Sequence, residues 1–178
     1  MQISTFQITA DDIPQHQEGL IALIQDAVAD GASIGFIAPL SYDDANRYWN
    51  HVQKAVAGGE KAIFIALDTD TNRVAGSGQL ENAFFPNGHH RAEVQKLLVH
   101  RDYRNQGIAR TLLTHLEKHA MSINRWLLVL DTVRGSVAEG IYKRSGYIES
   151  GGIPEYALSS AGVYEETVVF YKSLNKKA

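Results

Sequence analysis

Apolar and polar residues alternate with two different periods along this chain, and the period distinguishes strands from helices. Residues 2–8 alternate one by one, which predicts a first strand. Short apolar or β-branched runs predict further strands at 62–67, 74–80, 93–99, 126–130, from 147 onward, and 164–171. Apolar residues at helical spacing predict helices after Asp12, Ser41, Gly107 and Ser136.

Turn and cap residues separate these elements. Ser41 with Asp44 forms a capping-box pattern, and Gly135-Ser136 is typical of the start of a short helix. The glycines between residues 151 and 162 favour a loop there. The order β-α-α-β-β-β-α-β-α-β-β predicts one α/β domain over residues 1–178 with a mixed sheet.

Composition and charge narrow the function classes. The chain has 178 residues, 17 basic against 20 acidic, and a net charge of −3, so no overall basic field favours nucleic acid or an anionic membrane. It contains no cysteine, which removes disulfides and a thiol nucleophile. No apolar run has membrane-spanning length and no signal peptide is visible, so we expect a cytoplasmic protein. His115 and His119 lack a third ligand, so we expect no metal.

The segment from Ala92 to Ala120 carries the strongest chemical pattern. A buried strand leads through Arg104-Asn105-Gln106-Gly107-Ile108-Ala109 into a helix. The first amide groups of such a helix lack backbone partners and its dipole points outward, so the turn could hold a phosphate. An ordinary turn with solvated arginines is the alternative.

The pattern Arg-x-x-Gly-x-Ala between a strand and a helix resembles the coenzyme A pyrophosphate loop of the GNAT acetyltransferase superfamily. The order of elements is also similar to that superfamily. Within it the sequence is most similar to the tabtoxin resistance acetyltransferases. The similar segments are GASIGF (31–36), PNG (86–88), RAEVQKLLV (91–99), LDT (130–132) and GSVAE (135–139).

The resemblance implies a mixed, mostly antiparallel α/β sheet with a central splayed parallel strand pair flanked by helices. It also implies acetyl-CoA as co-substrate, with the pantetheine arm between the splayed strands. A backbone amide near a bulge at residues 97–99 would hold the developing oxyanion. The implied coenzyme contacts are Leu97, Leu98, Val99, Arg104, Asn105, Gln106, Gly107, Ile108, Ala109 and Arg110.

Three residues are catalytic candidates. Tyr142 falls where the family often has a tyrosine beside the thioester sulfur, and it could protonate the departing thiolate; a core tyrosine is the alternative. Glu93 opens the central strand and Asp131 closes the neighbouring one, so either could bind or deprotonate an amine whose pKa is about 10.4. The alternatives are a solvated strand-end charge for Glu93 and a turn residue for Asp131.

These features predict direct acetyl transfer from acetyl-CoA to the primary amine of a small, amino-acid-like molecule or toxin. Without cysteine, no acyl-cysteine route exists, which leaves attack within a ternary complex. A protein or peptide N-acetyltransferase and a non-catalytic acyl-CoA sensor are the rival hypotheses. The resemblance further implies that the protein could form a homodimer.

Overall fold

The computed structural model describes residues 2–160 and 162–174, and within them the elements follow the predicted order. The helices are α1 (Ile13–Ala29), α2 (Tyr42–Ala57), α3 (Ile108–Ser122) and α4 (Val137–Arg144), with short 3-10 turns at Pro86–Gly88 and Arg101–Tyr103. The strands are β1 (Ile3–Ile8), β2 (Lys61–Asp68), β3 (Arg73–Asn82), β4 (Arg91–Val99), β5 (Leu127–Val133), β6 (Ile148–Leu158) and β7 (Tyr164–Ser173).

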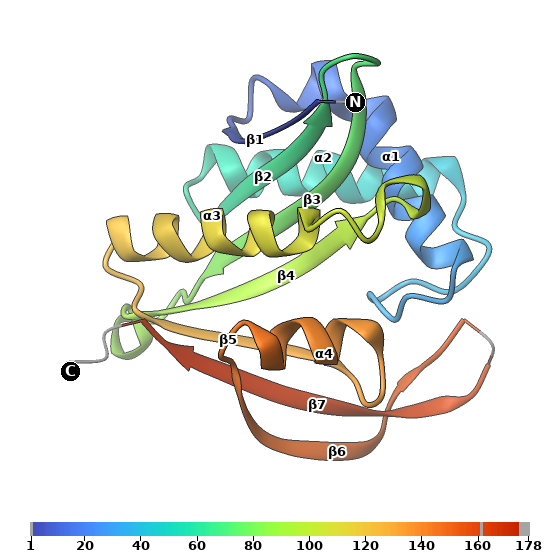
Figure 1. Cartoon of the computed structure of the whole chain (residues 1–178). Helices are drawn as coiled ribbons and strands as arrows, with labels where there is room; N and C mark the ends of the chain where they lie inside the picture. The colour runs from blue at the N-terminus through green and yellow to red at the C-terminus, as the bar shows by residue number, and fades with distance from the viewer. Residues whose placement is uncertain (1, 161, 175–178) are drawn as a thin grey trace.

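The strands form one mixed sheet in the order β1-β2-β3-β4-β5-β7-β6. Only the central pair of described strands, β4 and β5, is parallel, and every other neighbouring pair is antiparallel. Figure 1 shows β4 and β5 meeting at one end and diverging toward the other. The predicted fold class, with its splayed parallel pair, is therefore confirmed.

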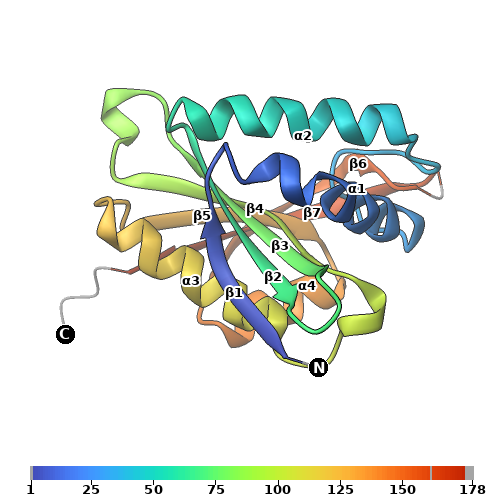
Figure 2. The ribbon, with the colours of Figure 1, turned by 90° about the horizontal axis from the view of Figure 1, so that it is seen from above.

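Helices cover both faces of the sheet, with α1 and α2 on one face and α3 and α4 on the other (Figure 2). Each face has its own apolar core. The cluster under α1 and α2 includes Trp49 and Ile63, whereas the cluster under α3 and α4 includes Leu112, Leu128 and Phe170. Two cores at 178 residues provide enough buried surface to keep a site between them fixed.

The predicted caps are present. The Ser41 hydroxyl accepts a hydrogen bond from the Asp44 amide at 3.1 Å, and the Ser136 hydroxyl accepts one from the Glu139 amide at 3.2 Å. Pro14 lies in the first turn of α1, where its missing N–H costs nothing. Local sequence signals therefore set these helix starts.

The expectation of a loop over residues 151–162 was wrong for residues 151–158, because β6 continues to Leu158, whereas Ser159, Ser160 and Gly162 lie outside any strand and residue 161 lies outside the described residues. Almost all of β6 is exposed, so it has no apolar alternation to reveal it. As an edge strand it pairs only with β7, and its ladder shifts between Glu149 and Gly151 and again between Ile153 and Ala157. An edge strand tolerates the glycines and Pro154 that suggested a loop.

The predicted end of the fifth strand at residue 130 also needs correction. Asp131, Thr132 and Val133 continue β5 and pair with Val169, Val168 and Thr167 of β7. Asp131 is therefore a strand residue rather than a turn residue, and Ser136 caps the helix that follows.

Among the described residues, the structure contains no helix with the length and apolar character needed to cross a membrane.

Candidate active site

The candidate site is centred on the point where β4 and β5 separate. The two strands pair only through Arg91 with Leu127, Ala92 with Leu128 and Glu93 with Val129. Beyond Glu93, β4 has no strand partner on its β5 side among the described residues, whereas β5 stays paired with β7 along its whole length. A thin, extended ligand could therefore lie along β4 and accept or donate backbone hydrogen bonds, as an added strand does.

A bulge in β4 lies within this separated region. The ladder with β3 advances two residues from Gln79 to Ser77, while β4 advances three from Gln95 to Leu98. The extra residue reverses the alternation of side chains, so Val94 packs in the core under α3 whereas Leu98 packs in the core under α1. Leu97 and Val99 also pack against the α3 side. The expected bulge thus begins at Lys96, one residue before the predicted range.

The loop before α3 exposes the first turn of that helix. Gly107 is the N-cap with φ of +78°, and no side chain caps the helix start. Asn105 also has a positive φ, of 61°. A Cβ at Gly107 would meet nothing within 4 Å, so the space in front of these amides is open. The amides of Ile108 and Ala109 can therefore receive an anion from solvent.

This loop is tied to α1 and β2 by three side chains. The buried Tyr103 hydroxyl donates to the Asp68 carboxylate at 3.0 Å, Arg101 pairs with Asp26, and Arg104 pairs with Asp30 at 2.6 Å. Arg101 and Arg104 are thus both held within the chain rather than extended toward a phosphate. Their roles here are to fix the loop and to bring positive charge close to it.

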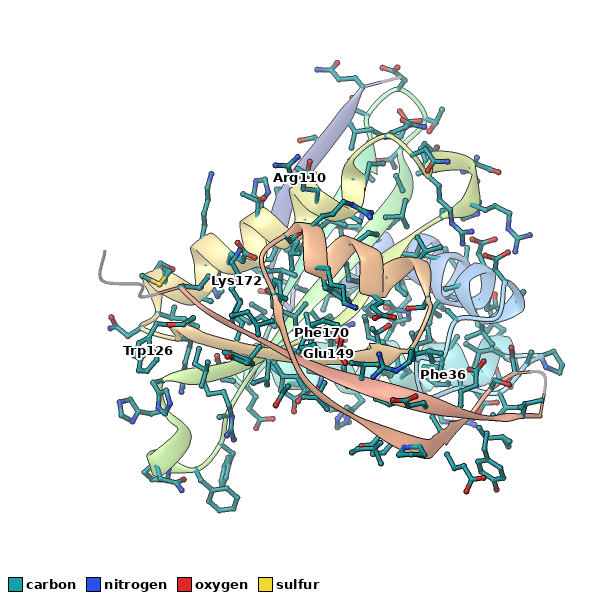
Figure 3. The ribbon with its side chains drawn as sticks, turned by 60° about the horizontal axis from the view of Figure 1, so that its bottom comes forward. Phe36, Arg110, Trp126, Glu149, Phe170 and Lys172 are labelled. Carbon is teal, nitrogen blue, oxygen red and sulfur yellow. The ribbon has the colours of Figure 1, made fainter. Side chains whose placement is uncertain are left out.

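A cavity of about 380 Å³ lies between α3, the end of α4 and β7. Arg110 from the first turn of α3 and Lys172 from β7 line it and are labelled in Figure 3. Lys172 is neutralised by Glu117 at 2.8 Å, whereas Arg110 and Arg144 are exposed and free of ion pairs among the described residues. These two arginines are suited to a second phosphate next to the α3 N-terminus. Arg144 was not predicted, because a helix-end arginine carries no local signal.

Tyr142 lies on the α3 and α4 side of the separation. Its ring is 6% exposed and packs 5.8 Å from the Tyr147 ring and 6.4 Å from the Phe170 ring, measured between centroids. Burial and, second, the charge of Asp131 raise the pKa of the Tyr142 hydroxyl above its ordinary value. The hydroxyl is therefore neutral and able to donate, although its ring also fills the core.

Glu93 and Asp131 lie on the opposite face. Their neighbours Ala92, Leu128 and Leu130 pack in the core under α3, so alternation places both carboxylates on the α1 and α2 side. Asp131 is solvent-exposed, yet the surrounding protein raises its pKa, while the charge of Lys96 opposes that rise. Both carboxylates interact electrostatically with Lys96, so the structure brings the three charges together.

A hydrogen-bonded relay holds Glu93 in place. Gln95 donates to Glu93 at 2.9 Å and accepts from the Lys61 ammonium at 2.7 Å, and that ammonium also donates to Glu81 at 2.8 Å. Glu93 is half-buried. It is therefore a positioned carboxylate rather than a freely solvated one.

Residues 34–147 match the family model described as the acetyltransferase (GNAT) family, which is more than half of the chain. The chain belongs to the GNAT acetyltransferase family. The match includes the β4 bulge, the loop before α3, Tyr142 and both candidate carboxylates.

Solved structures share this GNAT fold across nearly the whole chain. A ribosomal-protein-alanine N-acetyltransferase from Brucella melitensis is 22% identical with a TM-score of 0.77, covering 96% of this chain and 99% of that one. An Acinetobacter baylyi protein with a provisional acetyltransferase assignment is 19% identical with a TM-score of 0.81, covering 98% and 94%. A Salmonella typhimurium protein with the same provisional assignment, solved with its cofactor acetyl-CoA, is 14% identical with a TM-score of 0.77, covering 100% and 97%.

Sequence reasoning missed Lys96 and Tyr48. Lys96 lies in β4 between residues assigned to other roles, and nothing local shows that the bulge redirects its side chain. Tyr48 lies on α2, 48 positions earlier, and meets Lys96 only in the fold. A lysine in a strand next to two predicted carboxylates was the available signal.

His115 and His119 are accounted for by packing. Both rings contact Phe64, at 6.0 and 5.6 Å between centroids, and His115 Nδ1 lies 2.9 Å from the Thr111 carbonyl oxygen. Within the described ranges, no group of three or more potential metal ligands is present.

Proposed function

We propose that this GNAT protein transfers the acetyl group of acetyl-CoA directly to the primary amine of a small molecule. The observation that carries the proposal is the arrangement around the strand separation. A neutral, buried tyrosine lies on one side of the sheet, and two carboxylates lie on the other. Acid and base candidates are thus within one site but are separated by the backbone of β4 and β5.

The residues fit the coenzyme in three respects. The open α3 N-terminus around Gly107 can hold the pyrophosphate, Arg110 and Arg144 can hold a further phosphate, and the unpaired edge of β4 can hold the pantetheine amides. Acetyl-CoA, when bound, supplies a thioester. Everything else in the reaction falls to side chains and amides of this chain.

The chemistry needs the amine to lose two protons and the departing sulfur to gain one. Asp131 or Glu93 takes the first proton from the acceptor ammonium, whose ordinary pKa is about 10.4, directly or through water. As the new N–C bond forms and the C–S bond breaks, a backbone amide near the β4 bulge donates to the carbonyl oxygen, and Tyr142 donates its proton to the departing sulfur. The newly bonded nitrogen then loses its second proton to solvent, and the Tyr142 oxygen regains a proton from solvent. The chain has no cysteine to form an acyl-enzyme, so the transfer is direct.

Two aromatic rings beside Lys96 support a small acceptor. Tyr48 of α2 and Phe36 of the preceding loop pack edge to face at 5.4 Å on the face that carries Glu93 and Lys96. The similarity of segments 31–36 and 130–132 to the tabtoxin resistance acetyltransferases favours an amino-acid-like compound or toxin. The rival acceptor is a protein or peptide amine, and the Brucella melitensis structure is named as a ribosomal-protein-alanine N-acetyltransferase.

A thiol-release assay with acetyl-CoA tests the proposal. The panel contains amino acids, β-lactam analogues, polyamines, aminoglycosides and short peptides. We expect turnover confined to small amines. Turnover of peptides alone would favour the rival. Tight acetyl-CoA binding, with no release of thiol from acetyl-CoA in the presence of any amine, would favour a sensor.

A further inference from the structure

Lys96 has an unusual backbone conformation. It is the first residue of the β4 bulge and has φ of +47°, in the left-handed region that a residue with a Cβ adopts only at an energetic cost. Non-glycine residues in this region cluster at functional sites. Because a glycine at this position would remove the strain, the lysine side chain has to provide something that glycine does not.

The Lys96 ammonium is half-buried and lacks a hydrogen-bond acceptor. Its nitrogen lies 5.9 Å from the centre of the Tyr48 ring. Within the described ranges, no hydrogen bond joins it to an acceptor, and no carboxylate oxygen comes within the 4.0 Å of an ion pair. Burial and the charge of Lys61 lower the pKa of this ammonium, and the longer-range charges of Asp131, Glu93 and Glu81 oppose that change.

Lys61 on the same face provides the contrast. Its ammonium donates to Glu81 at 2.8 Å and to Gln95 at 2.7 Å, so it has both an ion-pair partner and a second hydrogen-bond acceptor within the protein. Lys96 has no such acceptor among the described residues, which costs free energy unless a ligand supplies one.

Tyr48 fixes the position of the Lys96 ammonium. Its hydroxyl donates to the Gln79 side chain at 3.0 Å, and its ring packs against Trp49 at 5.2 Å and against Phe36, which is labelled in Figure 3. A held aromatic face stabilises a cation without neutralising it. Phe36 lies well away from the coenzyme-side residues Arg110 and Lys172 in the same view, so this charge belongs to the acceptor side.

We propose that Lys96 binds an anionic group of the acceptor, a carboxylate or a similar oxyanion, while Glu93 and Asp131 receive the acceptor's ammonium. The inference rests on the proposed function and deepens it, because it assigns the acceptor to zwitterionic amino acids and their analogues. Two carboxylates near one unpaired ammonium form a surface complementary to a molecule that carries both charges a few bonds apart. Polyamines and aminoglycosides, which carry only positive charge, would place a cation against Lys96.

The test compares each amino acid with its own carboxamide, which has the same amine without the anion. The assay is thiol release from acetyl-CoA at a pH well above the ordinary carboxyl range. We expect the wild-type protein to prefer the acid in kcat/KM by about ten- to hundredfold, the range of a hydrogen bond to a charged group. Lys96→Met should remove that preference by slowing turnover of the acid far more than turnover of the carboxamide.

Two further variants separate recognition from structure. Lys96→Gly suits the positive φ, so it should fold at least as stably as the wild type and still lose the preference. Lys61→Met is the matched control on the same face and should change both substrates by the same factor.

Each result decides between specific alternatives. Equal loss for acid and carboxamide in Lys96→Gly would make Lys96 an internal counter-ion and overturn the inference. Turnover of amines without an acid group, with no preference for acids in the wild type, would overturn the inference and leave the proposed function standing. If no amine caused thiol release from acetyl-CoA, the proposed function itself would be overturned.

Discussion

The two faces of the sheet treat charge in opposite ways. Under α3 and α4, Tyr142 is buried among rings, and the candidate anion site is made of backbone amides at the start of α3. Under α1 and α2, Glu93, Lys96 and Asp131 present charged side chains. Burial raises the pKa of the Tyr142 hydroxyl and also that of the Asp131 carboxyl, where the charge of Lys96 opposes the rise. In the proposed reaction, one sheet would separate an acid from a base by placing them on different faces.

The comparison also shows which parts can vary. A backbone amide site depends on conformation and tolerates changes of side chain, whereas the charged face depends on residue identity. We therefore expect substitutions on the first face to act on coenzyme binding or proton donation, and those on the second to act on the acceptor. Four experiments test this division, from the largest expected effect to the smallest.

The strongest test is Tyr142→Phe. Removing the buried donor should lower kcat by about 10²- to 10⁴-fold, the usual contribution of general acid catalysis, while acetyl-CoA affinity by calorimetry stays unchanged. The matched control is Tyr147→Phe, whose equally buried ring lies 5.8 Å away and should leave kcat nearly intact. Full activity of Tyr142→Phe at every pH would assign Tyr142 to the core alone.

The second test is Gly107→Val at the start of α3. Valine at φ of +78° would push the loop out of its conformation and misplace the amides, so acetyl-CoA affinity should fall about ten- to hundredfold. Gly59→Val is the matched control, because Gly59 has φ of +73° and is equally open but follows α2. It should lose similar stability and keep its affinity. If both variants bound acetyl-CoA with equal affinity, the pyrophosphate site would have to lie somewhere other than the α3 N-terminus.

The third test uses pH to examine the charged face. Acceptor activation needs an ionised carboxylate, so kcat/KM should fall as the pH drops through the pKa of Asp131, which burial raises and Lys96 lowers. Lys96→Met removes the opposing charge and raises that pKa further, so the acidic limb should move to higher pH with an amine that carries no acid group. Lys61→Met should leave the acidic limb of the kcat/KM profile at its wild-type pH. If the acidic limb does not move in Lys96→Met, a group other than Asp131 takes the proton from the acceptor.

The smallest effect concerns stability. A carboxyl whose folded pKa lies above its unfolded value favours the protonated native state, so its ionisation destabilises the fold at neutral pH. Asp131→Asn should therefore raise the urea midpoint slightly at pH 7. The gain should shrink as the pH falls from the raised folded pKa to below the unfolded carboxyl pKa of about 3.9, because Asp131 is then protonated in both the folded and the unfolded chain. Destabilisation at pH 7 would indicate that Lys96 depends on Asp131 for its own burial.

Much of the fold was predictable from local sequence. The caps Ser41 and Ser136, the turn at Gly107 and the apolar period changes fix where elements begin, because each acts over a few residues. The edge strand β6 escaped prediction because an exposed strand needs no apolar alternation. Exposure removes the very signal on which a strand prediction depends.

The site was less predictable, because its details depend on distant partners. The sequence places Arg104 beside the phosphate loop, but only the fold brings it to Asp30, 74 positions away. Likewise, a bulge in β4 reverses which face Lys96 presents, and this depends on the register with β3. The sequence placed Glu93 and Asp131 at the ends of neighbouring strands, but their shared face follows from the pairing of Glu93 with Val129, which only the fold shows.

The three-pair seam between β4 and β5 joins the two halves of a seven-stranded sheet. Beyond these three pairs, β4 is held only by β3 and β5 only by β7 among the described strands, so the two strands do not hold each other. A molecule bound between them would contact residues far apart in the chain and would connect the two halves of the sheet for as long as it stays bound. Acetyl-CoA binding should then slow amide hydrogen exchange in β4 and β5 together, so that the coenzyme completes the sheet as well as the chemistry.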